Sequence, residues 1–439
     1  MDTLDTLILP KWLIPVEPRQ MVLEGHGVAI QNGRIHDLGS AQALLSKYQF
    51  SQKIDLTQHA LIPGLVNAHS HGPMALMRGV ADDTPLEPWL TDHIWPLEQR
   101  WMSPEYVEDG MRLALAEMLL GGTTCVQEMY FFPDVIARTM ADVGIRGCVG
   151  AVVIDFPSAW GEDAETYIRK ALDLHDAYKG HPLISVAFAP HSTYTVAPEV
   201  LRRLGVLSDQ LDLRIQIHLQ ETAQEVKDVV RMHGARPMAL LRSLGLLTPS
   251  LTAIHMTQIE AEEVQWLTDC DASVVHCPES NLKLASGFCP VQDLLEAGVN
   301  VGLGTDGAAS NNNLSMLGEM QSAALVAKGV AQSATALNAH EALRMATLGS
   351  AKSMGLEHQI GSIEIGKWAD LAAIDMNHVS LQPVYDPASQ IVYSAGDHHV
   401  SDVWVAGRQM VENGAPVALD MHDTLRKTQT WQQRFSNSE

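Results

Sequence analysis

The chain has 439 residues, of which 29 are Lys or Arg and 52 are Asp or Glu, so its formal net charge is −23. This acidic balance argues against nucleic acids and anionic membrane surfaces as partners, because both require clustered basic side chains. The hydrophobic fraction of 46% and the charged fraction of 18% are those of an ordinary globular protein with a sizeable core. The class of partner that remains is a small neutral or cationic ligand.

The cysteines and the N-terminal segment indicate in which cellular compartment the protein is found. The five cysteines form no C-x-x-C pair, and their odd number does not fit a disulfide framework. The segment MDTLDTLILPKWLIPVEP carries acids where a signal peptide needs bases. No uncharged apolar run reaches the ~18 residues that a membrane span requires. We therefore expect a cytoplasmic protein.

Apolar runs that end abruptly in polar residues recur from residue 61 onward. There are eight: LIPGLVNAHSH, TTCVQEMY, IRGCVGAVVID, LISVAFAPHS, LRIQIHLQE, LTAIHMT, ASVVHCPES and VNVGLGTDG. Such composition is typical of strands buried on both faces of a parallel sheet. The segments between them can hold crossover helices, such as residues 103–121 with Ser103 as N-cap and Gly121 at the end. The alternation predicts a (β/α)8 TIM barrel; an open doubly wound sheet would carry a Gly-rich phosphate loop, and none is present.

The two ends of the chain have a different pattern. Residues 22–38 alternate around Asn32-Gly33, which is a strong hairpin signal. Residues 368–375 and 401–412 are predicted as further short strands. We therefore expect a small β-sandwich domain formed from both termini, residues 1–60 and 362–439, on either side of a barrel at 61–361. The polar stretch from residue 420 is predicted to be a surface helix or tail.

Histidines and one aspartate stand where the apolar runs end. His69 and His71 are spaced i, i+2, so both imidazoles can point the same way from one strand. His218 ends the fifth run, His255 the sixth and Asp306 the eighth. Active sites of barrels are assembled at the C-terminal ends of the strands. Each of these residues alone is more often a core, surface or turn residue. Three imidazoles and one carboxylate, however, suit Zn²⁺. The joint pattern therefore predicts a metal site.

Longer segments resemble the amidohydrolase superfamily over nearly the whole chain: PGLVNAHSH, IHLQE, AIHMT, GTDGAASNNN, EALRMATLGSAKSMGL and GSIEIGKWADLAAID. Within that superfamily the sequence resembles the branch of cytosine deaminases and chlorohydrolases. The segments DTPLEPWLTDHIWPLE, SNLKLASG, PHSTY and HLQET carry a narrower match, in which the sequence is most similar to the 5′-methylthioadenosine/S-adenosylhomocysteine deaminase family. The resemblance implies a zinc-dependent hydrolase that releases ammonia from an adenine nucleoside.

The resemblance also implies roles for single residues. It makes zinc ligands of His69, His71, His218 and Asp306, and acid/base groups of Glu221 and His255. Relatives with two metals carry a carboxylated lysine at the end of the fourth strand, whereas this strand reads SVAFAPHS. One zinc ion per subunit is therefore expected.

In the implied reaction, water attacks C6 of the adenine ring. Glu221, three residues beyond His218, would protonate the ring nitrogen N1 as general acid. Asp306 would take the proton of the water, and His255 would hold the attacking oxygen by a hydrogen bond. Ammonia then leaves and an inosine-type product remains.

Substrate contacts are expected from the long connection at residues 72–103 and from later strand ends. By the resemblance, Glu98 would accept hydrogen bonds from ribose hydroxyls, Trp89 would pack near the sugar or thioether, and His191 would contact the nucleoside. The alternative for Trp89 is simple capping of the barrel. Arg146 is a candidate for the carboxylate of S-adenosylhomocysteine, but no second basic residue follows it in GCVGAVVID. The preferred substrate is therefore 5′-methylthioadenosine, with S-adenosylhomocysteine or adenosine as further substrates.

Two other functions stay open from the sequence. One keeps the fold and the metal but acts on another heterocycle, as a guanine or cytosine deaminase or a triazine chlorohydrolase. The other is a non-catalytic scaffold, although such proteins generally lose metal ligands. The expected partner is a small nucleoside, with neither nucleic acid nor membrane, and a homo-oligomer is an open alternative to a monomer.

Overall fold

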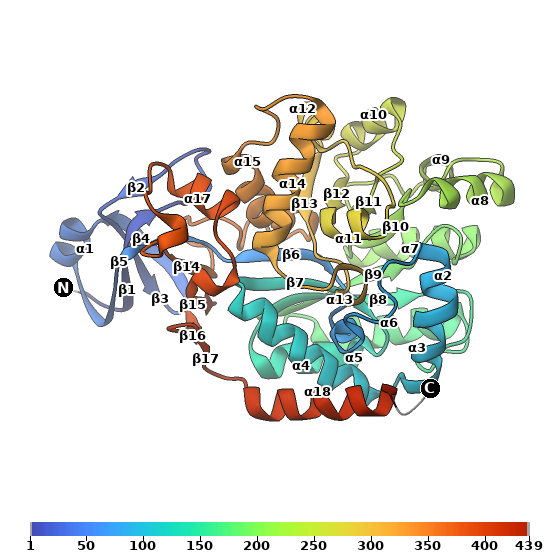
Figure 1. Cartoon of the computed structure of the whole chain (residues 1–439), viewed down its shortest axis with the longest axis horizontal. Helices are drawn as coiled ribbons and strands as arrows, with labels where there is room; N and C mark the ends of the chain where they lie inside the picture. The colour runs from blue at the N-terminus through green and yellow to red at the C-terminus, as the bar shows by residue number, and fades with distance from the viewer. Residues whose placement is uncertain (1, 437–439) are drawn as a thin grey trace.

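The computed structural model describes residues 2–436, which form a parallel barrel with a smaller β unit beside it (Figure 1). The barrel strands lie in sequential order from β6 to β13. Their bounds are β6 Leu65–Ser70, β7 Thr123–Tyr130, β8 Arg146–Val153, β9 Ile184–Pro190, β10 Ile215–Leu219, β11 Leu251–His255, β12 Ser273–His276 and β13 Asn300–Leu303. Each of the eight apolar runs contains one of these strands, so the predicted TIM-like barrel is confirmed.

The barrel closes between its first and last strands. An isolated parallel bridge joins Ser70 to Asp306, and the Asp306 N–H donates to the His69 carbonyl at 3.0 Å. Gly304 permits this approach, because a Cβ atom at that position would lie 2.7 Å from the His69 backbone nitrogen. Two residues that the sequence singled out as metal ligands are therefore joined directly by the closing contact.

Helices follow the strands and cover the outside of the barrel. Their bounds are α4 Pro104–Leu120, α5 Pro133–Val143, α6 Ala164–Tyr178, α7 Pro198–Leu211, α8 Ala223–His233, α9 Pro237–Ser243, α10 Ala261–Asp269, α11 Pro278–Lys283, α12 Val291–Glu296, α13 Ala308–Asn311, α14 Met316–Ala331, α15 Ala339–Arg344, η3 Met345–Gly349 and α16 Ser350–Ser353. The helix predicted at 103–121 is α4: Ser103 Oγ accepts from the Tyr106 N–H at 3.2 Å, and Gly121 is the C-cap. The spacing of its apolar residues buries Val107 and Met111 against the barrel.

The second sheet combines strands from both ends of the chain. Its bounds are β1 Asp2–Leu13, β2 Leu23–Glu24, β3 His26–Gln31, β4 Arg34–Ser40, β5 Tyr48–Pro63, β14 Leu371–Asp375, β15 Val400–Val405, β16 Arg408–Glu412 and β17 Ala415–Pro416, with α1 Ala41–Lys47 beside β4. The strand order is β17-β16-β15-β14-β5-β1-β3-β4, so β14 and β5 join the two halves. Val28 of β3 and Trp404 of β15 pack in the same buried cluster, so distant parts of this mixed sheet enclose one core. The predicted β unit from both termini is confirmed.

The hairpin predicted at Asn32-Gly33 connects β3 to β4. Both residues have positive φ angles, 52° and 74°, as a two-residue hairpin turn of this kind requires. Gly33 also lies close to the carbonyl oxygen of Ala406, where an added Cβ atom would meet it at 2.3 Å. The glycine therefore serves both the turn and the packing of the β unit.

A buried ion pair joins the β unit to the barrel. Arg146 opens β8, and its Nε donates to Asp370 Oδ2 at 2.7 Å while Nη2 donates to Oδ1 at 3.2 Å. The two side chains are 3% and 1% exposed. Asp370 precedes β14, and its Oδ1 also accepts from the Ala406 N–H at 2.7 Å. The pair is bidentate and shielded from solvent, so each charge depends on the other.

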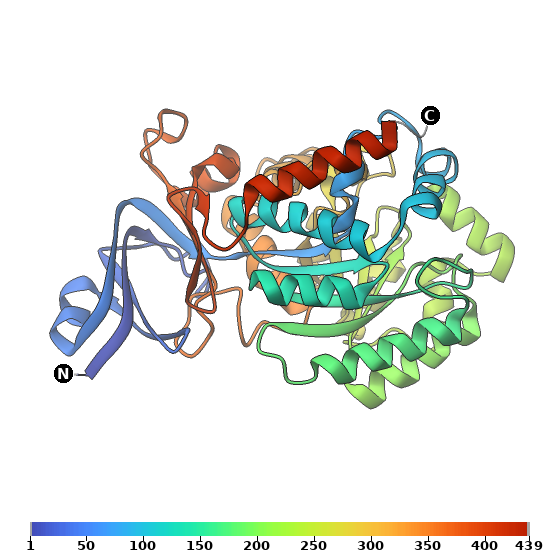
Figure 2. The ribbon, with the colours of Figure 1, turned by 90° about the horizontal axis from the view of Figure 1, so that it is seen from below.

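The last helix, α18 Met421–Ser436, lies along α4 (Figure 2). The predicted surface helix or tail is thus a docked helix. Trp431 is buried, and its indole N–H donates to Asp109 Oδ2 at 3.0 Å. Lys427 donates to the other oxygen of Asp109 at 2.8 Å. Within residues 2–436, no helix combines the length and apolar character that crossing a membrane requires.

Removal of one partner of the buried pair should destabilise the fold. Asp370→Ala leaves the Arg146 charge buried without compensation, and we expect the free energy of unfolding to fall by about 3–5 kcal/mol. Urea denaturation followed by circular dichroism measures the change. The control is Asp173→Ala, which breaks an exposed ion pair with Arg169 and should alter stability little. Equal losses in the two variants would contradict the assignment.

Candidate metal centre and active site

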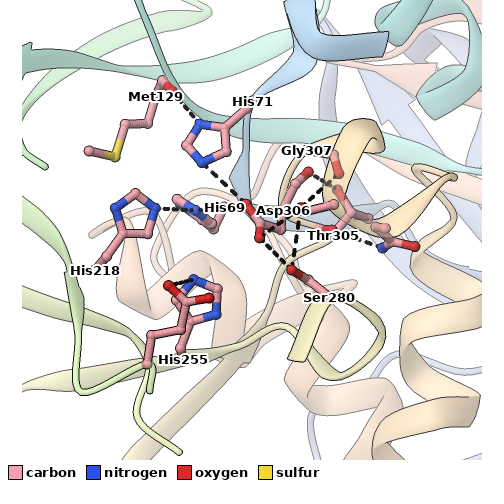
Figure 3. A network of polar contacts seen from close by, with 12 residues as sticks. His69, His71, Met129, His218, His255, Ser280, Thr305, Asp306 and Gly307 are labelled. Atoms are coloured by element: carbon pink, nitrogen blue, oxygen red, sulfur yellow. Dashed lines mark hydrogen bonds and ion pairs between the residues drawn. The ribbon is translucent and has the colours of Figure 1, made fainter. Parts of the chain in front are cut away.

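Four side chains converge at the C-terminal edge of the barrel. His69 and His71 come from the end of β6, His218 from β10, and Asp306 follows β13; ligand atoms of all four lie within 4.8 Å of one another. The Nε2 atoms of His69 and His218 are 3.1 Å apart. Asp306 Oδ1 lies 3.5 Å from the Nε2 of His69 and 3.2 Å from that of His71 (Figure 3). These are the four ligands that the resemblance implies, and they form one group.

Each of the four side chains makes a further hydrogen bond that turns its ligand atom toward the other three. Each histidine directs its Nδ1 to an oxygen acceptor, which leaves Nε2 facing the group: His69 to Gln216 Oε1, His71 to the Met129 carbonyl and His218 to the His191 carbonyl. Asp306 Oδ2 accepts from Ser280 Oγ at 2.6 Å and from Ser310 Oγ at 3.1 Å. Outer contacts of this kind fix the tautomer and orientation of metal ligands.

Burial sets the charges of the four groups. It lowers the pKa of His69 to about 4 and holds the pKa of His218 well below its usual value, so both rings are neutral at neutral pH. Burial would lower the pKa of His71 as well, but contact with Asp306 outweighs it and raises that pKa to about 9. Burial acts to raise the pKa of Asp306, and contacts with the histidines hold it far below the ordinary range. The donor set is thus three imidazoles and one carboxylate.

Glu221 lies beside this group, on the turn between β10 and α8. Burial raises its pKa to about 8, and the negative charge of Asp306 acts in the same direction. Its Oε1 accepts from Ser286 Oγ at 3.2 Å. Its backbone carbonyl accepts from Thr257 Oγ1 at 2.6 Å, so main chain and side chain are both held. At neutral pH the carboxyl group is protonated and can donate.

His255 ends β11 and faces Glu221. Its Nε2 lies 3.8 Å from Glu221 Oε2, its Nδ1 contacts Asn281 Oδ1 at 2.9 Å, and its ring stacks on that of His218 at 5.5 Å. Burial lowers its pKa, so the ring is neutral at neutral pH. His255 has a φ angle of 74° and Asp306 one of 61°, which is left-handed backbone that costs about 1–3 kcal/mol per residue. Such strain clusters at functional sites.

A cavity of about 690 Å³ opens over these residues. Three predicted substrate contacts line it: Trp89, Glu98 and His191. Glu98 is half-buried, and the removal of its carboxyl group from water raises its pKa to about 7; it accepts from the Tyr130 hydroxyl at 2.6 Å. His191 contacts Thr195 Oγ1 through Nδ1 at 3.1 Å. The residues that could contact substrate therefore share one cavity with Glu221, His255 and three of the four metal ligands, His71, His218 and Asp306.

The connection at residues 72–103 forms one wall of this cavity. It contains η1 Gly72–Met77, α2 Leu86–Pro88, η2 Trp89–Ile94 and α3 Trp95–Trp101. Trp89 is buried on the cavity side, whereas Trp95 at 38% and Phe156 at 42% exposure pair at the rim with ring centres 6.4 Å apart. The long connection is thus a helical wall with an aromatic rim.

The assignment of Arg146 to substrate binding is wrong. Arg146 stands at the start of β8, at the opposite end of the strand from the metal group, and it does not line the cavity. Both of its bonds to Asp370 are buried, so its charge is already neutralised. The position within the strand explains the error, because only the C-terminal end of a barrel strand reaches the active site.

Several supporting residues were missed from the sequence: Ser280, Ser310, Asn281, Ser286, Gln216 and Tyr130. Each acts through one hydrogen bond to a predicted functional side chain. Serines and asparagines are common at strand ends and turns for local reasons, so no pattern distinguishes these. The only available signal was proximity in sequence, as for Ser310, four residues after Asp306.

A parallel barrel that brings three histidines and one aspartate together at its C-terminal edge defines a metal-dependent hydrolase. The chain belongs to the amidohydrolase family, whose model matches residues 60–410. This match covers the barrel and most of the C-terminal part of the β unit.

Individual relatives match along nearly their full length. A protein of Teredinibacter turnerae named 5-methylthioadenosine/S-adenosylhomocysteine deaminase is 46% identical, covering 99% of this chain and 98% of its own length. The crystal structure of an adenosine deaminase from Xanthomonas campestris with bound zinc is 47% identical, with a TM-score of 0.98 and 99% of each chain covered. The atrazine chlorohydrolase of Arthrobacter aurescens, complexed with zinc, is 25% identical, with a TM-score of 0.91 over 97% of this chain and 99% of its own.

Metal binding should displace a proton from His71. In the metal-free protein the His71 pKa of about 9 keeps the ring protonated at about pH 6. Water bound to zinc has a pKa near 7, so at pH 6 it keeps most of its protons and adds little to the proton release. Uptake of the first zinc ion should therefore release about one proton, and zinc affinity should rise with pH up to about 9. Calorimetry in buffers of different ionisation enthalpy measures the proton count.

The matched variants are His71→Ala and His358→Ala, the latter at an exposed histidine. His71→Ala should abolish the proton release and weaken zinc binding by roughly tenfold or more. His358→Ala should behave as the original protein. Zinc uptake without proton release in the original protein would refute the charge assignment.

Proposed function

We propose that the chain is a zinc-dependent hydrolytic deaminase of adenine nucleosides, with one zinc ion per subunit and 5′-methylthioadenosine as the preferred substrate. The observation that carries the proposal is the position of Glu221, a buried carboxyl group beside the metal ligands and 3.8 Å from His255, where burial raises its pKa to about 8. A heteroaromatic ring is a poor electrophile until one of its nitrogens is protonated, so its hydrolysis needs such a donor.

The residues of the metal group fit zinc in chemistry and number. His69, His71, His218 and Asp306 would hold the ion, and the outer contacts already orient their donor atoms. When bound, zinc supplies Lewis acidity that lowers the pKa of a water molecule to about 7.

The side chains around this point can divide the proton transfers. Glu221 delivers its proton to N1 of the adenine ring, which makes C6 electrophilic. Asp306, which is ionised, takes a proton from the attacking water. His255, neutral and 3.8 Å from Glu221, is placed to hold the attacking oxygen by a hydrogen bond. Asp306 then passes this proton to the amino group, which leaves as ammonia, and the C6 hydroxyl returns a proton to Glu221, so an inosine-type base remains.

The ribose would be bound by the helical wall and the facing strand ends. Glu98 offers a carboxylate oxygen to the sugar hydroxyls, with Tyr130 holding the other side of that group. Trp89 gives an apolar surface for the sugar or thioether. His191 follows β9 and lines the same cavity, where it can contact the nucleoside. A bare base would leave Glu98 with the Tyr130 hydroxyl as its partner and no sugar hydroxyl to bind, so this set favours nucleosides.

The lining of the cavity also favours an uncharged 5′ group. Among the described residues that line it, none is Lys or Arg. The rim carries Trp95 and Phe156, which suit a methylthio group. A homocysteine tail would bring a carboxylate and an ammonium group against this apolar rim without an ion-pair partner, which is unfavourable. Methylthioadenosine is therefore the better substrate of the two.

Glu221→Gln should lower kcat by about 10²–10⁴ while leaving the zinc content unchanged, because the amide cannot supply the proton. In the original protein kcat/KM should hold at neutral pH and fall as the pH rises through about 8, where the donor ionises. Steady-state ammonia release across pH measures both effects.

The control for this variant is Glu262→Gln, at an exposed position of α10. It should match the original protein in rate and pH profile. If Glu221→Gln kept full activity with methylthioadenosine, the proposed general acid would be disproved.

A substrate panel tests the proposed specificity. Methylthioadenosine should exceed S-adenosylhomocysteine in kcat/KM by roughly tenfold or more, because the charged tail lacks a partner. Adenosine should be turned over, and guanine, cytosine and atrazine should release neither ammonia nor chloride at a comparable rate. Glu98→Gln should raise KM for the nucleosides, since a sugar contact is weakened.

The panel separates the competing functions. Turnover of atrazine, or of guanine or cytosine, in place of the nucleosides would favour an amidohydrolase for another heterocycle. No turnover of any compound by the zinc-loaded protein would favour a scaffold. Either result would overturn the proposal.

A further inference from the structure

A second group of metal-ligating side chains lies outside the active site. Its members are His378, His398 and His399, and one ring nitrogen of each lies within 4.8 Å of the others. None of the three lines the cavity of the active site. Among residues 2–436, this group and the four ligands described above are the two clusters with such spacing.

The histidines come from the two ends of one connection in the β unit. His378 precedes the short helix η4 Val379–Leu381, just after β14, while His398 and His399 belong to η5 Asp397–His399, just before β15. Since β14 and β15 pair in antiparallel fashion, the end of one and the start of the other meet at the same edge of the sheet. The intervening segment carries α17 Pro387–Tyr393, which packs against α14 and α15 of the barrel (Figure 1).

The nitrogen atoms of two rings face each other. His399 Nε2 lies 3.2 Å from His378 Nδ1, and Ser380 Oγ lies 2.9 Å and 2.7 Å from these two atoms. Two imidazole nitrogens bound to one zinc ion at tetrahedral angles are roughly 3.3 Å apart. The pair His69 and His218 in the active site has nearly the same spacing, 3.1 Å. The distance fits two ligands of one cation as well as a hydrogen bond between the two rings.

The third ring completes the donor set. The His398 and His399 ring centres are 3.9 Å apart, and those of His378 and His398 are 5.7 Å apart. His399 is 3% exposed, and its Nδ1 lies 3.0 Å from the backbone nitrogen and 3.1 Å from the carbonyl oxygen of Gly396; donation to this oxygen puts the ring lone pair on Nε2. The other two rings are exposed and can adjust by side-chain rotation. One fixed ligand with two adjustable ligands, open to solvent, is an accessible site.

We propose that His378, His398 and His399 form a second, peripheral site for a divalent transition metal such as Zn²⁺, with solvent completing the coordination. Three neutral imidazoles suit zinc, copper and nickel and do not suit magnesium. A cation there ties η4 to η5 and so fixes both ends of the segment that carries α17. The site is independent of the catalytic reaction proposed above.

The test is metal stoichiometry of the full-length protein. Equilibrium dialysis against micromolar zinc, with the metal measured by atomic absorption, should find a second zinc per chain beyond the active-site ion. The double variant His378→Ala/His398→Ala should lose only this second ion or bind it at least roughly tenfold more weakly. It should keep the deaminase rate of the original protein, and magnesium should not occupy the site.

Two controls make the result decisive. His358→Ala removes an exposed histidine outside the cluster and should retain both zinc ions. His69→Ala removes an active-site ligand and should retain the peripheral ion while losing the catalytic one. If the original protein and the double variant bind the same amount of zinc, or if magnesium binds equally well, the peripheral site does not exist.

Discussion

The contact between the first and last strands of the barrel determines both its closure and its metal site. The Asp306 N–H donates to the His69 carbonyl, so two ligands from opposite ends of the barrel sequence are tied by one backbone hydrogen bond. Beneath it, Asn67 exchanges two hydrogen bonds with Thr305, at 2.7 and 3.1 Å. Asp306 adopts left-handed backbone at this point, and the surrounding bonds compensate for the strain. The ligand geometry is therefore a property of barrel closure and not of a flexible loop.

Burial in this closed edge has opposite effects on acids and bases, and the site uses both. Removal from water disfavours charge, so His69 and His218 become neutral donors for a metal while Glu221 becomes a neutral acid. Asp306 alone among these stays ionised, because the neighbouring imidazoles stabilise its charge. One low-dielectric environment thus provides two neutral imidazoles, a protonated acid and a charged carboxylate side by side, while His71 next to Asp306 holds a proton until a metal displaces it.

The sequence was sufficient to predict the parts of this arrangement that follow from position along a strand. Apolar runs locate buried strands, and a polar residue at the end of a run lies at the active edge, as His218 and His255 do. Arg146 shows the limit of the argument. It begins its run, and its partner Asp370 lies 224 residues later, so nothing local distinguished a structural charge from a binding one.

Contacts between separate elements were equally invisible in the sequence. The length of the segment at 72–103 indicated a functional connection, but the bond from Tyr130 to Glu98 requires β7 to face α3. The serines on Asp306 and the asparagine on His255 come from α11 and α13, short helices whose sequence has no distinctive pattern. Orientation of functional groups was set by tertiary packing, which a single sequence does not display.

The docking of α18 gives the two ends of the chain unequal importance for engineering. Trp101, at the end of α3, packs against Trp431 and Phe435 of α18, with ring centres 6.3 and 6.1 Å apart. Glu98 lies one helical turn before Trp101, so the last helix braces the wall that holds this carboxylate. A fusion partner or surface anchor attached after α18 would therefore disturb the helices that form this wall of the cavity. A fusion partner attached beside β1 would lie on the far side of the β unit and would leave the cavity undisturbed (Figure 1).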